Sequence, residues 1–84
     1  MKIKLMYITE GGSEWLNEII SVNDFNYMKS IDDYIARNQS KAEQLEDKWQ
    51  SNGEDVSLIL NVEPIDPISN KELSMKVLMY VENM

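Results

Sequence analysis

The fold of this chain is decided by its longest periodic stretch, which runs from Asp24 to Ser51 and reads DFNYMKSIDDYIARNQSKAEQLEDKWQS. Side chains spaced alternately by three and four residues form one stripe in it: Met28, Ile31, Ile35, Asn38, Ala42, Leu45 and Trp49. This spacing places them along a single face of an α-helix. The stretch therefore predicts one long amphipathic helix.

The sequence leaves the start of this helix undecided but predicts its end. Ser30 and Ser40 are each followed three residues later by an acid, which is the pattern of a capping box at a helix start. The helix could therefore start near Ser30, or it could break near residues 38–39. At the far end, Asn52 and Gly53 predict termination, because glycine suits the left-handed position after a helix.

Before the helix, residues 2–9 alternate apolar and polar side chains and predict a strand. Residues 10–13, with two glycines, predict a tight hairpin turn. Residues 14–22 fit either a returning strand or a helix capped by Ser13. The glycine turn and the β-branched ending favour the strand.

After the helix, residues 55–62 and 73–81 both alternate apolar and polar side chains and predict two further strands. The connection between them, residues 63–70, carries two prolines, which we expect to exclude sheet pairing there. The whole predicts an α+β fold in the order ββαββ, with one helix on one face of a four-stranded antiparallel sheet. Its 84 residues correspond to one domain, residues 1–84.

The composition indicates the cell compartment of the protein and argues against several classes of enzyme. The chain has no cysteine, no apolar stretch of membrane-spanning length and no signal-peptide pattern, so we expect a cytoplasmic protein, in the host cytoplasm if a phage encodes it. Histidine is also absent, and no glycine-rich phosphate-binding motif occurs. These absences argue against an enzyme and predict no cofactor, no metal site and no catalytic residue.

The net charge of −7 opposes direct binding to nucleic acid or to an anionic membrane and favours a protein partner with a basic surface. The bland alternative is that acidity only keeps the chain in solution. The excess of acidic over basic residues lies outside the helix. If residues 14–22 form a strand, Glu14 and Glu18 share one face of it. The candidate acidic rim consists of Glu10, Glu14, Glu18, Glu54, Asp55, Glu63 and Asp66.

One helix cannot cover both faces of the predicted sheet, so apolar side chains are left on the opposite face. Such a face is typical of a partner or dimer interface, although isolated exposed apolar residues are common. Trp15 is added as a candidate anchor, while Trp49 is expected in the core. The candidate apolar set is Met6, Ile8, Trp15, Ile59, Leu78 and Tyr80.

No motif is specific enough to assign a family. In size, acidity and alanine-poor composition the chain resembles small proteins of phages and mobile elements. Many of those are stoichiometric inhibitors of host or defence proteins, and some mimic DNA. The resemblance implies an acidic inhibitor of a basic, nucleic-acid-binding protein, and the alternative is a structural or regulatory homodimer that uses the apolar face.

Overall fold

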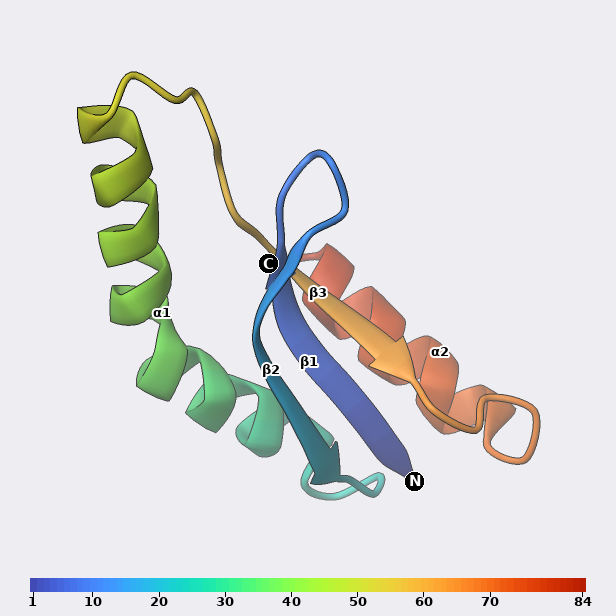
Figure 1. Ribbon diagram of the computed structural model, residues 1–84. Coiled ribbons are helices and arrows are strands. Elements are labelled where there is room, and N and C mark those ends of the chain that lie inside the picture. The colour runs from blue at the N-terminus through green and yellow to red at the C-terminus, as the bar shows by residue number, and fades with distance from the viewer.

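A three-stranded antiparallel sheet in the order β2-β1-β3 forms the centre of the computed structural model, which describes residues 1–84 (Figure 1). The central strand is β1 (Lys2–Ile8), joined by a hairpin to β2 (Glu14–Ser21). The other neighbour of β1 is β3 (Ile59–Pro64). The strand prediction for residues 14–22 is thus confirmed, whereas the four-stranded sheet is wrong.

Two helices cover one face of this sheet. The first, α1 (Tyr27–Ser51), lies along β1 and β2, and the second, α2 (Lys71–Glu82), packs beside β3. Alternate residues of β1 point into the layer that both helices share. The core consists of Ile3, Leu5, Tyr7, Val22, Ile31, Tyr34, Ala42, Val62, Leu73 and Val77. The opposite face of the sheet has no covering element.

The long helix α1 is continuous and buries the middle of the predicted stripe, whereas Met28 at its start is 47% exposed, contrary to the prediction. Ile31, Asn38 and Ala42 are buried, and Tyr34 joins them and stacks on Tyr7 with ring centroids 6.0 Å apart. Buried Asn38 is satisfied because its side-chain amide donates to the Tyr34 carbonyl at 2.9 Å. The helix begins before Ser30, so the later start and the break near residues 38–39 did not materialise.

The segment predicted as a fourth strand, residues 73–81, is the helix α2. Its alternation also satisfies helical spacing, because Leu73 and Val77 are four residues apart and both are buried on one face. Leucine, methionine, lysine and glutamate favour helix over strand. Because the sheet stops at β3, α2 can cover the part of the core that α1 does not reach. The chain order is therefore ββαβα.

The strand β3 starts and ends later than residues 55–62. It includes Pro64, which lies opposite Ile3, so the expectation that the prolines exclude pairing was wrong at this position. Proline is tolerated there because β3 is an edge strand and Pro64 is its last residue. No helix of the chain is both long and apolar enough to span a bilayer.

Candidate functional site

The hairpin between β1 and β2 presents Glu10 at its tip. The Gly12 N–H donates to the Thr9 carbonyl at 2.9 Å and closes the turn. The Ser13 N–H donates to the Thr9 hydroxyl at 3.1 Å. Gly12 has φ +89°, a left-handed conformation that glycine adopts without a side-chain clash. The turn is therefore fixed by local chemistry, as the glycine pair predicts.

The end of α1 is built in a similarly local way. Gly53 has φ +82°, its N–H donates to the Gln50 carbonyl and the Glu54 N–H donates to the Trp49 carbonyl, both at 3.0 Å. These two bonds form a Schellman motif, which reverses the chain direction. Glu54 and Asp55 therefore follow directly on the last turn of α1. From there the chain returns to β3, whose first residue pairs with the end of β1.

These two connections meet at the hairpin end of the sheet and enclose an open cleft of about 580 Å³. One wall is the β1–β2 turn, and the other is the segment that leads from α1 into β3. The cleft is lined by Thr9, Glu10, Gly11, Ser13, Trp15, Trp49, Glu54, Asp55, Val56, Ser57 and Ile59.

The two tryptophans of the chain form the aromatic part of this cleft. Trp15 in β2 and Trp49 in α1 meet edge to face, with ring centroids 5.2 Å apart and planes at 63°. Trp15 remains 39% exposed. Trp49 is half-buried and does not belong to the buried core, so the expectation that it lies in the core is wrong. The sequence singles out both residues but does not predict their contact, which depends on how β2 crosses the end of α1.

All charged residues that line the cleft are acidic. Glu10, Glu54 and Asp55 line it together with no lysine or arginine. The ion pairs of the chain are Lys4–Glu14, Lys29–Asp33, Arg37–Glu18 and Lys76–Asp24, and none of them uses a cleft acid. The cleft carboxylates thus carry negative charge that no side chain of the protein neutralises.

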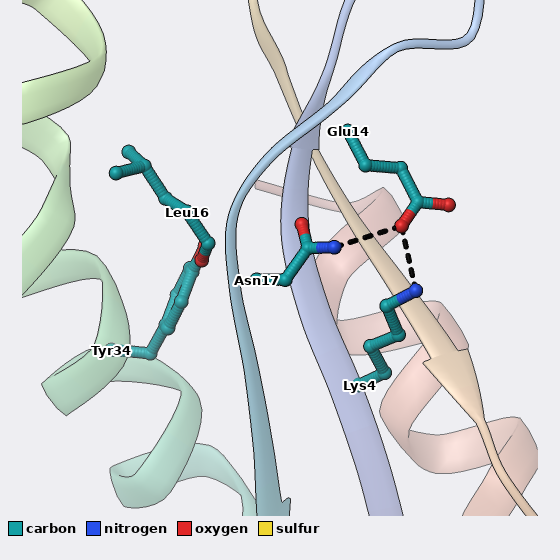
Figure 2. A network of polar contacts seen from close by, with 5 residues as sticks. All are labelled: Lys4, Glu14, Leu16, Asn17 and Tyr34. Carbon is teal, nitrogen blue, oxygen red and sulfur yellow. Dashed lines mark hydrogen bonds and ion pairs between the residues drawn. The ribbon is translucent and has the colours of Figure 1, made fainter.

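The geometry of the cleft depends on a bulge in β2. Leu5 pairs with Glu18 and Tyr7 with Trp15, so Leu16 and Asn17 together oppose the single residue Met6. Leu16 has φ +58°, which is rare for a residue with a branched side chain. The Tyr34 hydroxyl donates to the Leu16 carbonyl at 2.8 Å and holds this conformation from α1. Figure 2 shows Leu16 directed toward α1 and Asn17 toward Glu14.

Because the bulge resets the alternation of β2, Glu14 and Glu18 lie on opposite faces of the sheet. The expectation that they share a face is wrong. Glu14 lies in register with Ile8 and bonds to Lys4 on the uncovered face. Glu18 lies in register with Leu5 and pairs with Arg37 of α1.

On the uncovered face, Glu14 accepts hydrogen bonds from Lys4 at 2.6 Å and from Asn17 at 3.0 Å (Figure 2). The bond from Lys4 is the main cause that lowers the pKa of Glu14 below its ordinary value, and the same bond raises the pKa of Lys4. Glu14 therefore already has a cation of its own chain.

On the helix side, Glu18 accepts a hydrogen bond from the Arg37 guanidinium at 2.7 Å. This bond lowers the pKa of Glu18 and raises that of Arg37. Glu18 serves to tie β2 to α1, and an external cation would have to displace Arg37 to reach it.

The remaining candidates of the acidic rim are distant from the cleft. Glu63 lies opposite Lys4 on the uncovered face. Asp66 follows β3 at the other end of the sheet, in the loop before α2 (Figure 1). The structure thus gathers only Glu10, Glu54 and Asp55 into one site.

The candidate apolar set is also divided. Met6, Ile8 and Ile59 lie on the uncovered face; Met6 is only 1% exposed in the central strand, and Ile59 is 63% exposed. Trp15 lies toward α1, against Trp49. The other two members, Leu78 and Tyr80, belong to α2 and not to the sheet. The Tyr80 hydroxyl donates to Asp32 at 2.7 Å, which holds this residue against α1.

The cleft offers aromatic rings and separated carboxylates, a combination suited to binding an organic cation. No three acidic side chains of the chain converge in the way a metal site requires. No family model, no curated protein and no solved structure matches the chain.

Proposed function

We propose that this chain is a small acidic, non-catalytic binding protein that occupies a basic surface of a protein partner. The observation that carries the proposal is the cleft at the hairpin end, which three acidic residues and no basic residue line. Charge of one sign in a concave site strengthens the field there and raises the local concentration of an oppositely charged partner.

The distribution of the remaining charge supports the same partner. A net charge of −7 on a small surface attracts basic proteins and repels nucleic acid, whose phosphates require lysine and arginine. The cleft carboxylates at the hairpin end of the sheet can take the place of phosphates on a nucleic-acid-binding protein. We therefore propose a stoichiometric inhibitor of a basic, nucleic-acid-binding protein; the composition that resembles small phage proteins supports a host or defence protein as the target.

The test is affinity capture from cells that express the chain, followed by release with duplex DNA. We expect one basic protein to be captured in a stoichiometric amount and to be released when DNA competes for the same surface. Glu54→Gln combined with Asp55→Asn should weaken capture strongly.

A matched control is available in the chain. Asp66→Asn combined with Glu72→Gln removes the same charge and the same residue types, but at the opposite end of the sheet. This control should capture the partner like the wild type. Equal loss in both variants would show that only total charge matters, and a captured protein that DNA does not release would contradict inhibition of nucleic-acid binding.

A second candidate function, a homodimeric interaction module, is favoured by a different observation. A groove of about 550 Å³ between β3 and α2 is lined mainly by apolar side chains, namely Ile59, Leu60, Val62, Leu78, Val81 and Met84. It lies beside an open strand edge, which a second copy of β3 could extend. Leu78→Asp should then convert a dimer to a monomer in sedimentation analysis, and a wild type that is monomeric at high concentration would remove this candidate.

A further inference from the structure

The aromatic part of the cleft leaves indole surface exposed. The Trp15 and Trp49 rings meet at 63° rather than in parallel, so one indole directs its edge at the face of the other. Trp15 keeps 39% of its surface exposed at this site. A planar guanidinium can stack on an exposed indole face, whereas an ammonium interacts with it as a point charge.

The carboxylates favour the same ligand. A metal ion needs several oxygens within about 2.0–2.6 Å, and no group of acids in the chain meets such a requirement. A guanidinium instead has five N–H donors in one plane and can bridge carboxylates that come from separate segments. Glu10 comes from the hairpin tip, and Glu54 and Asp55 come from the segment after α1.

From these two observations we infer that the cleft binds a single arginine side chain of the partner, an inference that rests on the binding function proposed above. The guanidinium stacks on Trp15, and its N–H groups donate to the carboxylates that line the cleft within their reach, from the set Glu10, Glu54 and Asp55. The surrounding acidity attracts the partner, and this side chain fixes its position. Arginine is preferred to lysine because only arginine combines stacking with several donors in one plane.

The test uses intrinsic tryptophan fluorescence, because both tryptophans of the chain line the cleft. The protein is titrated with N-acetyl-arginine amide, N-acetyl-lysine amide and N-acetyl-citrulline amide at low salt. Citrulline has the shape of arginine without the charge. We expect saturable binding of the arginine compound, binding of the lysine compound weaker by roughly two- to five-fold, and no binding of citrulline. Magnesium chloride should leave the fluorescence unchanged.

Variants of the protein show which residues the fluorescence response to arginine depends on. Glu54→Gln combined with Asp55→Asn should weaken arginine binding by about three-fold or more, as loss of two partly exposed charge contacts implies. Asp66→Asn combined with Glu72→Gln should bind like the wild type. Trp15→Leu keeps an apolar side chain but removes the ring, and it should reduce the preference for arginine over lysine. Circular dichroism of each variant checks that it is folded.

The outcomes separate this inference from the proposed function. Equal binding of arginine and lysine, binding of citrulline, or a response to magnesium overturns the arginine site. So does an arginine response that survives in the Glu54 and Asp55 variant. In each of these cases, capture of a basic partner that depends on Glu54 and Asp55 would still support the proposed function. Failure of that capture contradicts the proposed function, and an arginine-selective fluorescence response would then support the arginine site alone.

Discussion

Two pairs of acids on this protein, Glu14 and Glu18 in β2 and Glu54 and Asp55 after α1, have very different surroundings. Glu14 and Glu18 each hold a cation of the same chain, Lys4 at 2.6 Å and Arg37 at 2.7 Å. The other pair lines a cleft without any basic residue. An acid that already has a partner in its own chain stabilises the fold, and an acid without one remains available for a ligand. Pairing, rather than the amount of acid in a segment, distinguishes the two regions.

The largest expected effect comes from removing the ring of Trp49, which packs against Trp15 and lines the cleft. Trp49→Ala deletes the half-buried indole at the end of α1, and we expect the free energy of unfolding to fall by about 3 kcal/mol, as loss of a large aromatic side chain implies. Denaturant unfolding followed by circular dichroism measures this loss.

Trp49→Phe is the control, and it should recover most of the stability because it keeps an aromatic contact for Trp15. A Trp49→Ala variant as stable as the wild type would mean that the contact between the two indoles does not hold the cleft wall in place.

A smaller effect follows from Tyr34→Phe, which removes the hydroxyl that donates to the Leu16 carbonyl. We expect a loss of about 1–2 kcal/mol, because a partly buried carbonyl loses its donor and the bulge loses its support. Tyr27→Phe is a matched control, since it removes a hydroxyl for which the structure shows no hydrogen bond. If both variants lose the same stability, the bond to Leu16 does not stabilise the bulge.

The pair of Glu18 and Arg37 predicts a pH dependence. The pKa of Glu18 is lowered by Arg37, so the pair stabilises the folded state fully above the ordinary value of 4.5 and this contribution is lost as the pH falls through the lowered pKa. Glu18→Gln lacks the contribution at every pH. The difference in unfolding free energy between wild type and Glu18→Gln should therefore shrink between about pH 6 and about pH 3. A difference that is constant or grows toward low pH would contradict the assignment.

The smallest expected effect is on the unfolding midpoint, when an acid with an ion-pair partner and an acid without one are each replaced. Glu14→Gln should lower the unfolding midpoint slightly, because the exposed pair with Lys4 is lost. Glu10→Gln should leave the midpoint unchanged or raise it slightly, since Glu10 has no partner and the chain has net charge −7. The reverse order of the two midpoints would overturn the distinction between paired and unpaired acids.

Much of the fold follows from local sequence signals. The alternation of residues 2–9, the two glycines of the hairpin and the stripe of α1 each specify one element, and Gly53 specifies the end of the helix. The segment 73–81 does not specify its structure, because Leu73 and Val77 are compatible with both periods. Which period prevails depends on the uncovered core beside β3, and this is a property of the assembled sheet.

The sequence predicts the individual acids of the cleft but not that they line one site. Glu10, Glu54 and Asp55 stand out as acids in turns, but the antiparallel pairing of β3 with β1 brings them together. The bulge could not be predicted, since Leu16 at φ +58° carries none of the glycine or asparagine signals of a left-handed residue. It depends on Tyr34, which lies 18 residues away along the chain. The division of Glu14 and Glu18 between two faces follows from it.

The most direct test of the central claim is an amide correlation spectrum of the ¹⁵N-labelled protein during titration with an alternating arginine–serine peptide. We predict shifts confined to the hairpin tip, the end of α1 and the start of β3, including both indole N–H signals. Glu54→Gln combined with Asp55→Asn should reduce these shifts, and Asp66→Asn combined with Glu72→Gln should not. Shifts centred on Glu14 and Glu18, or spread evenly over all acidic surfaces, would contradict the claim that the unpaired acids of the cleft form the binding site.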